Sequence, residues 1–186
     1  PNKNRAKKFA FTDDQTKAYN GLIKFINEPY NPKDFKRALI GPGGTGKTFL
    51  LKALLQDCNI PFSEIGLSAP SHKACRVLKN SIRGIHCNVN TIQSEKFDIN
   101  NVTFSSYGRI KIEDYRLYIV DESSMLNRSL VTYIDKMMKK YSIKLILCGD
   151  DAQIPPVNEK DSYAFKGVTS FRLTQIVRQD EDNPIR

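Results

Sequence analysis

The sequence predicts an α/β fold, with a mainly parallel sheet flanked by helices. Short apolar runs recur along the chain, and stretches with the apolar spacing of amphipathic helices separate them. A glycine-rich loop joins the first of these runs, residues 37–40, to a helix-forming stretch that starts near residue 48. The 186 residues are enough for one domain with a sizeable hydrophobic core.

The glycine-rich loop has the pattern G-x-x-x-x-G-K-[ST] of a phosphate-binding P-loop. Its glycines let backbone N–H groups turn inward around phosphate oxygens, and the helix that follows points its positive end at them. We expect Lys47 to reach the β- and γ-phosphates and Thr48 to hold Mg²⁺ through its hydroxyl. A turn that only caps a helix is disfavoured, because strand, loop, Lys-Thr and apolar helix face follow in the order that the motif requires. The expected nucleotide-binding residues are Gly41, Pro42, Gly43, Gly44, Thr45, Gly46, Lys47 and Thr48.

The chain begins with a basic stretch, residues 1–10, that we expect to be a disordered tail. A helix is expected from there to about residue 27, because apolar residues recur at helical spacing. Thr12 and Gln15 fit a capping box at its start. Gln15 could also read the adenine edge, because an amide both donates and accepts hydrogen bonds. The sequence leaves both interpretations open.

The second apolar run, residues 65–69, is followed by Pro70, Ser71, His72 and Lys73 and then by a helical pattern. Free N–H groups at a helix start, a hydroxyl and a cation together suit a nucleic-acid phosphate. A plain helix cap with a solvated lysine explains the same residues.

Residues 88–115 have poor periodicity, and we interpret their later part as a small inserted hairpin. The aromatic residues Phe97, Phe104 and Tyr107 could stack on bases there. They could equally form the core of the hairpin itself.

The third apolar run, residues 117–120, delivers two carboxylates to the edge of the sheet where ligands bind in open α/β folds. We expect Asp121 to hold Mg²⁺ through water and Glu122 to act as the general base that polarises the attacking water. A pair of acids that opens a helix is the alternative interpretation.

Two further segments carry candidate residues. After the fourth run, residues 144–148, a turn with two prolines holds Gln153, which could sense the γ-phosphate. After the fifth run, residues 171–174, Arg178 could stabilise the transferred phosphoryl group as an arginine finger, or be an ordinary surface residue.

The composition favours an anionic partner. The formal net charge is +9 and the pI is about 9.4, although four of the basic residues lie in the expected tail. The four cysteines are scattered, so neither a zinc site nor a disulfide framework is indicated, and a cytoplasmic location fits. No apolar run approaches the roughly 18 residues of a membrane span, and no signal peptide is visible, so we expect no membrane partner.

In their order along the chain, these segments resemble the motifs of superfamily 1 DNA helicases, in particular the RecD and Dda type that moves 5′ to 3′. Residues 90–94 resemble a further DNA-contacting motif, in which the family commonly has His where this chain has Gln93. The matching segments are 11–15 for the Q motif, 41–48 for motif I, 69–74 for motif Ia, 121–124 for motif II, 149–157 for motif III and 173–179 for the motif IV-like segment with its arginine.

The resemblance implies the first RecA-like motor domain, residues 11–94 and 116–186, with a small 1B-like hairpin at 95–115. It implies ATP and Mg²⁺ as ligands, and single-stranded DNA and single-strand to double-strand junctions as partners. The implied catalytic residues are Lys47, Asp121, Glu122, Gln153 and Arg178, and the implied DNA contacts are Pro70, Ser71, His72, Lys73, Thr91, Gln93 and Phe97.

The resemblance also implies an ATP-dependent DNA helicase that couples hydrolysis to translocation and unwinding. The second motor domain of that family has no counterpart before Arg186, and the chain begins with Pro1, so we expect a fragment with weak activity. A DNA-binding ATPase switch that does not unwind DNA is the alternative. A small-molecule kinase is disfavoured, because it has no need for a Gly-Asp-x-x-Gln segment.

Overall fold

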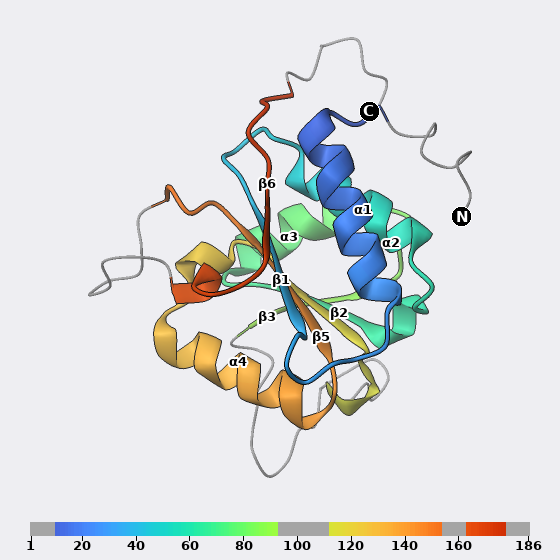
Figure 1. The fold of residues 1–186 in the computed structure, drawn as a ribbon, viewed down its shortest axis with the longest axis vertical. Coiled ribbons are helices and arrows are strands. Elements are labelled where there is room, and N and C mark those ends of the chain that lie inside the picture. Colours follow the sequence, from blue (N-terminus) through green and yellow to red (C-terminus); the bar gives the residue numbers. More distant parts are fainter. Residues whose placement is uncertain (1–9, 93–111, 154–162, 178–186) are drawn as a thin grey trace.

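The computed structural model describes residues 10–92, 112–153 and 163–177. Over these residues the chain forms a six-stranded sheet in the order β3-β2-β4-β5-β1-β6, and every strand pair is parallel. Helices flank the sheet, as Figure 1 shows. The predicted α/β class and mainly parallel sheet are therefore confirmed. The strands are β1 (Lys36–Ile40), β2 (Ile65–Ala69), β3 (Asn88–Thr91), β4 (Leu117–Val120), β5 (Lys144–Gly149) and β6 (Ser170–Arg172).

Three of the four main helices in the described part of the chain start at a side-chain cap that the sequence supplies. The capping box expected at the first helix is present, because the Thr12 side chain accepts from Gln15 N and the Gln15 side chain accepts from Thr12 N. Ser71 and Asn127 cap the third and fourth helices in the same way, each accepting a backbone N–H from three residues ahead. The helices are α1 (Asp13–Asn27), α2 (Lys47–Asp57), α3 (His72–Ser81) and α4 (Arg128–Lys140).

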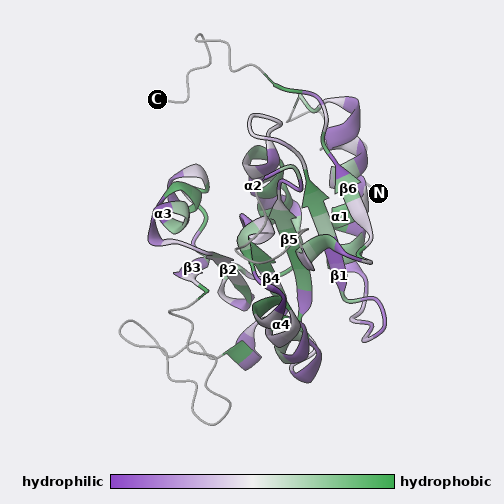
Figure 2. Cartoon of the chain, turned by 90° about the vertical axis from the view of Figure 1, so that its left-hand side faces the viewer, coloured by the Kyte–Doolittle hydropathy of each residue, from purple (hydrophilic) through white to green (hydrophobic). Residues whose placement is uncertain are grey.

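Alternation along the central strands divides the core into two layers. Leu117 and Ile119 of β4 pack with residues of α1, α2 and α3, whereas Tyr118 and Val120 pack with residues of α4. Figure 1 shows α1 and α2 on one side of the sheet and α4 on the other. In Figure 2 the central strands are coloured as hydrophobic and the outer turns of α1 and α4 as hydrophilic. Burial on both faces of the sheet explains why the sequences of the central strands are continuous apolar runs.

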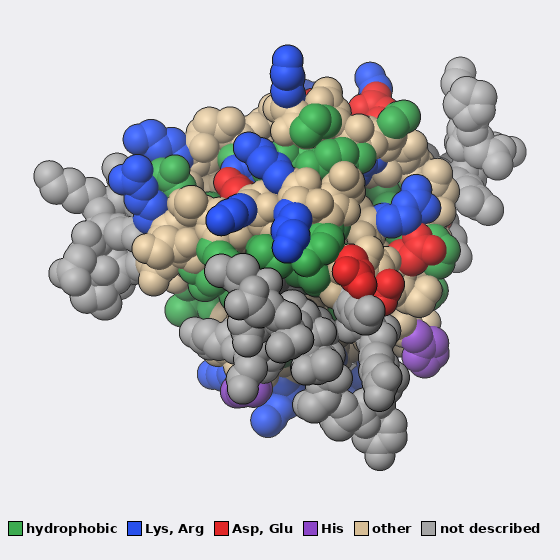
Figure 3. Space-filling model, turned by 90° about the horizontal axis from the view of Figure 1, so that it is seen from below, with side chains coloured by type: hydrophobic (Ala, Val, Ile, Leu, Met, Phe, Trp, Pro, Cys, Tyr) green, Lys and Arg blue, Asp and Glu red, His purple; other side chains and the backbone are tan. Residues whose placement is uncertain are grey.

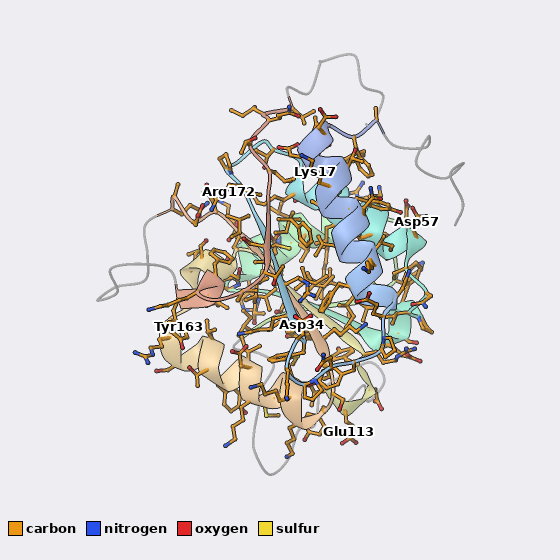
Figure 4. All side chains as sticks on the ribbon, viewed as in Figure 1. Lys17, Asp34, Asp57, Glu113, Tyr163 and Arg172 are labelled. Atoms are coloured by element: carbon orange, nitrogen blue, oxygen red, sulfur yellow. The ribbon has the colours of Figure 1, made fainter. Side chains whose placement is uncertain are left out.

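Two polar contacts fix α1 to its neighbours. Lys144, which is 5% exposed, donates from Nζ to the backbone carbonyls of Phe25, Ile26 and Glu28 at the end of α1. A cation at the C-terminal end of a helix is favourable, because unpaired carbonyls collect there. Asp57, labelled in Figure 4, accepts from the Tyr19 hydroxyl at 2.7 Å and so joins α2 to α1.

Three details differ from the sequence expectation or lie beyond the described residues. Strand β3 was not predicted, because its sequence Asn-Val-Asn-Thr has a single large apolar residue. Ile112, expected in the hairpin, lies instead in a short 3₁₀ helix, Ile112–Asp114, and is buried in the α4 layer together with Tyr115. The rest of the expected hairpin and the expected basic tail fall on residues outside the described ranges.

The surface is basic without a single dominant cluster in the view from below. Lys and Arg side chains are spread over several parts of that face, with a few acidic side chains between them (Figure 3). Within the described part of the chain, no helix is both long and apolar enough to cross a membrane.

Candidate active site

The parallel pairing brings the loops after β1, β2, β4 and β5 to one edge of the sheet. The register places Ile40 beside Gly149, and Ser68 beside Val120. The P-loop, the motif Ia turn, the acidic pair and the motif III turn all begin at these strand ends. This edge is where open α/β sheets bind ligands, and the sequence-predicted site residues of the described ranges gather there.

The P-loop has the backbone that its glycines allow. Gly44 and Gly46 both have φ of +80°, a left-handed conformation that is costly for residues with a Cβ. Helix α2 begins directly after Gly46, and no side chain caps its first N–H groups. Such a helix start can receive a phosphate, because its amide hydrogens and the helix dipole both favour an anion.

Close neighbours explain the glycines at the two ends of the loop. A Cβ on Gly41 would lie 2.6 Å from the carbonyl oxygen of Leu173, and a Cβ on Gly46 would lie 2.5 Å from Gln15 Nε2. By contrast, a Cβ on Gly43 would meet nothing within 4 Å. Packing against backbone thus excludes a larger residue at Gly41, a Cβ at Gly46 would force the Gln15 amide to move, and Gly43 borders open space.

Lys47 lies along the inside of its own loop. Its Nζ donates to the carbonyl oxygens of Gly41 at 2.5 Å and Pro42 at 3.0 Å. The Thr45 hydroxyl donates to the same Pro42 oxygen at 2.8 Å. The ammonium group is therefore held at the loop, where it can meet phosphate oxygens. Thr48, one residue further on, is partly exposed at the start of α2.

The two motif II carboxylates lie in unfavourable surroundings for negative charge. The Asp121 N–H donates to the Ser68 carbonyl at 2.8 Å, which fixes the end of β4 against β2. Burial raises the pKa of Asp121, although a hydrogen bond from the Glu122 N–H and the charge of Lys47 oppose this. Glu122 has φ of 50°, a strained value for a residue with a side chain. Such strain and burial at adjacent acids are typical of functional sites.

The charges of two lysines from different segments of the chain act to lower the pKa of Glu122. Burial and the neighbouring Asp121 raise the pKa of Glu122, while the charges of Lys47 and Lys73 oppose them. Lys47 belongs to the P-loop motif and Lys73 to the first turn of α3. The acidic pair is therefore within electrostatic range of both the predicted ATP-binding segment and the predicted DNA-binding segment.

The motif III turn is tied to both the acidic turn and β6. Ser124 Oγ donates to Gln153 Oε1 at 3.4 Å, and Gln153 is otherwise exposed. Arg172, labelled in Figure 4, forms two hydrogen bonds of 2.9 and 2.6 Å with the Asp151 carboxylate. Ser124 and Arg172 were not predicted as site residues. Their contacts join residues from separate strands, and the sequence spacing gave no signal for them.

Gln15 does not present its amide to solvent. It is 2% exposed, its Oε1 accepts from Thr12 N at 3.1 Å, and its Nε2 donates to the Thr45 carbonyl at 2.9 Å. The capping box is thus confirmed, and the same side chain contacts the P-loop. The reading of adenine by Gln15 stays a prediction.

Two of the residues expected to contact DNA, His72 and Thr91, line an open groove between α3 and β3. Ser71, His72 and Lys73 are exposed, Pro70 is partly exposed, and Thr91 is 4% exposed. The groove has a volume of about 280 Å³. It is lined by His72, Cys75, Arg76, Lys79, Val89, Asn90 and Thr91.

Arg76 and Lys79 were not predicted as site residues. Both are exposed, and both fall on the face of α3 that His72 occupies, because residues three to four apart share a helix face. This helical spacing from His72 was the available signal. Gln93, Phe97 and Arg178 lie outside the described ranges, so their roles stay predictions.

The residues at this edge fit a nucleoside triphosphate with Mg²⁺. The uncapped start of α2, the Lys47 ammonium at the loop and the partly buried carboxylates supply donors, a cation and metal-attracting oxygens. In the described part of the chain, no group of three or more His, Cys, Asp or Glu side chains could hold a metal ion by itself. A Mg²⁺ ion here would depend on phosphate oxygens as well as Thr48 and Asp121, which is its usual mode in nucleotide sites.

Fold and motifs together define a domain of the P-loop NTPase fold with a RecA-like sheet. Residues 24–186 match the family model AAA_30, described as an AAA domain, and the chain belongs to this family.

Among curated proteins, the uncharacterized protein R530 of Acanthamoeba polyphaga mimivirus is 27% identical over 194 residues. That match covers 90% of this chain and 38% of the mimivirus protein.

Two solved helicase structures share the fold. The Pif1 helicase from Candida albicans matches with a TM-score of 0.60 and 20% identity, over 92% of this chain and 41% of that one. The PRRSV helicase matches with a TM-score of 0.50 and 18% identity, over 76% of this chain and 30% of that one. These matches confirm the expected RecA-like P-loop fold, and the chain spans about two fifths of the length of the Pif1 helicase.

Proposed function

We propose that this chain is the ATP-binding motor domain of an ATP-dependent DNA helicase of the RecD/Dda type, moving 5′ to 3′. One observation carries the proposal: the P-loop and the acidic turn are both held to the end of β5, because the Gly41 N–H donates to the Gly149 carbonyl at 3.0 Å and Ser123 Oγ donates to the Cys148 carbonyl at 2.8 Å. The P-loop and the acidic pair therefore lie close to each other at the carboxyl edge of the sheet, as hydrolysis of a triphosphate requires.

Each side chain has a defined task in this proposal. Lys47 pairs with the β- and γ-phosphate oxygens, in place of the Gly41 and Pro42 carbonyls that it contacts in the structure. Asp121 and Thr48 hold Mg²⁺, which neutralises phosphate charge when bound. Glu122 accepts a proton from the attacking water, and burial beside Asp121 raises its pKa and so favours proton uptake.

Gln153 and Arg178 complete the proposed catalytic set. Gln153 lies in the motif III turn and contacts Ser124, two residues after Glu122, so a change at the γ-phosphate can reach both turns. Arg178 follows the segment 173–177, whose Val177 N–H donates to the Gly44 carbonyl at 3.0 Å. The chain therefore passes over the P-loop immediately before Arg178.

The DNA part of the proposal uses the groove between α3 and β3. Single-stranded DNA is a chain of phosphates, and His72, Arg76 and Lys79 line this groove. Lys73, next to His72 in the first turn of α3, is outside the groove lining, and its charge opposes the rise in the pKa of Glu122. DNA that also reached Lys73 would compete for this charge, which offers a route from DNA binding to the general base.

The first test measures binding of a fluorescent ATP analogue with Mg²⁺. We expect Lys47→Ala to weaken binding by at least about tenfold, equal to about 1.4 kcal/mol. Lys52→Ala is the matched control, since it removes the same charge from the same helix and should leave binding unchanged. Equal affinities of the two variants would refute the nucleotide assignment.

A second measurement separates a helicase from a DNA-binding switch. Unwinding is followed on duplexes with a 5′ or a 3′ single-stranded tail, together with ATP hydrolysis with and without DNA. The proposal predicts hydrolysis that DNA stimulates and unwinding that needs the 5′ tail. DNA and ATP binding without unwinding by the longest natural form of the protein would support the switch instead.

A further inference from the structure

Two consecutive peptide units of the P-loop are oriented by groups outside the loop. The Gly44 carbonyl accepts from the Val177 N–H at 3.0 Å. The next carbonyl, that of Thr45, accepts from Gln15 Nε2 at 2.9 Å. Gln15 comes from the start of α1 and Val177 from the segment 173–177, so separate parts of the chain hold neighbouring units of the same loop.

The geometry of a trans peptide makes these bonds relevant to phosphate binding. The C=O and N–H groups of one planar trans unit point in opposite directions, and no described peptide bond is cis. Holding the Gly44 carbonyl outward therefore turns the Thr45 N–H inward, and holding the Thr45 carbonyl does the same for the Gly46 N–H. Inward N–H groups are what a P-loop offers to phosphate oxygens.

Asp14 secures the segment that carries Val177. Its Oδ2 accepts from Thr174 N at 2.6 Å, from Gln175 N at 3.1 Å and from the Thr174 hydroxyl at 3.3 Å. At the other carboxylate oxygen, Asp14 accepts from Gln15 N at 2.8 Å. The adjacent residues Asp14 and Gln15 thus contact the P-loop by two routes, one through the segment 173–177 and one directly.

We propose that Asp14 and Gln15 are positioning residues of the triphosphate site, holding the Gly44 and Thr45 carbonyls outward so that the following N–H groups face the phosphates. This inference rests on the proposed function of binding ATP. A positioning role of Gln15 would be independent of the nucleobase of the ligand, because both groups of its side-chain amide are hydrogen-bonded to Thr12 and Thr45. The expected ligand class is any nucleoside triphosphate or inorganic triphosphate with Mg²⁺.

The test compares Mg²⁺ complexes of ATP, GTP and inorganic tripolyphosphate, with affinities measured by calorimetry. Gln15→Glu keeps an acceptor for the capping box but, as a carboxylate, has no hydrogen to donate to Thr45. Asp14→Asn replaces the charged acceptor of the Thr174 and Gln175 amides by a weaker, neutral one. Asp13→Asn is the control, since Asp13 is the exposed neighbouring acid in the same first turn.

We expect Gln15→Glu and Asp14→Asn to weaken binding of all three ligands by similar factors, about three- to tenfold each, which is the size of one lost hydrogen bond. Asp13→Asn should bind as the unmodified chain does. Amide hydrogen exchange gives an independent readout, because Asp14→Asn should speed exchange at Thr174, Gln175 and Val177 without ligand. A role in global stability alone would lower the melting temperature and leave these affinities unchanged.

Several outcomes would overturn the inference. If Gln15→Glu weakened ATP but not tripolyphosphate, Gln15 would read the base rather than position the loop. If Asp14→Asn matched Asp13→Asn in affinity and amide exchange, the proposed route through the segment 173–177 would be wrong. This comparison tests the proposed positioning role even if Gln15→Glu fails to fold. If the unmodified chain bound none of the three ligands, the proposed function would fail as well.

Discussion

The close approach of Gln15 to Gly46 predicts what one added methyl group should do. In Gly46→Ala the new Cβ would lie 2.5 Å from Gln15 Nε2, and the residue would keep φ near +80° or distort the loop. Gly84→Ala is a matched control, because Gly84 has φ of +86° but nothing within 4 Å of its added Cβ. The two variants share the backbone penalty and differ in the clash.

The expected cost follows from these contacts. A left-handed alanine costs about 1–2 kcal/mol in either variant. At Gly46 the clash also displaces the Gln15 amide and leaves the Thr45 carbonyl, in a residue that is 0% exposed, without its partner. An unpaired buried acceptor costs about 1–3 kcal/mol. We therefore expect Gly46→Ala to lower the free energy of unfolding by about 2–5 kcal/mol and Gly84→Ala by about 1–2 kcal/mol.

Urea unfolding followed by circular dichroism measures both values, provided that the slope with denaturant stays constant. Binding of fluorescent ATP is measured in parallel on the folded variants. Gly46→Ala should also bind ATP more weakly, whereas Gly84→Ala should bind it normally. Equal losses of stability in the two variants, with unchanged ATP binding in both, would refute the packing argument.

Two further predictions concern the carboxylates and the groove. Burial raises the pKa of Asp121 in the folded state, so the stabilising contribution of its protonated form is full below the unfolded pKa and is lost as pH rises through the folded pKa. In thermal unfolding at pH 7 without ligand, Asp121→Asn should therefore be more stable than the unmodified chain, and a loss of stability would contradict this. The same variant should bind Mg²⁺ and ATP more weakly. Arg76→Ala and Lys79→Ala should each weaken single-stranded DNA binding and reduce the slope of log affinity against log salt concentration by roughly 0.7. Lys136→Ala, on α4 across the sheet, is the control and should change neither quantity. An unchanged slope in the two groove variants would exclude phosphate contacts at the groove.

The fold could be predicted because local signals agree with the final structure. The apolar runs at β1, β2, β4 and β5 are buried on both faces, and the Thr12 and Gln15 capping box marks the start of α1. Strand β3 was not predicted because it lies at the edge of the sheet, where alternate residues stay partly exposed and asparagine is tolerated. Its pairing with β2 supplies the stability that its own sequence does not indicate.

The site could be predicted as far as its motifs but not in its contacts. The spacing of Lys47 and Thr48 after the glycines indicates a phosphate loop by itself. The bond between Gln15 and Thr45 joins residues 30 positions apart, and that between Asp14 and Thr174 joins residues 160 apart. Such contacts depend on how α1 packs against the sheet and on the pairing of β6 with β1, and no local sequence pattern encodes this arrangement.

The central claim is that a triphosphate binds at the carboxyl edge of the sheet, between the P-loop and the acidic pair. The most direct test is titration of the ¹⁵N-labelled chain with Mg²⁺ and ATP, with backbone amide shifts followed by NMR. The account predicts the largest shifts at Gly44, Thr45, Gly46 and Lys47. Shifts that leave these amides unchanged and cluster elsewhere, for example along α4, would contradict it.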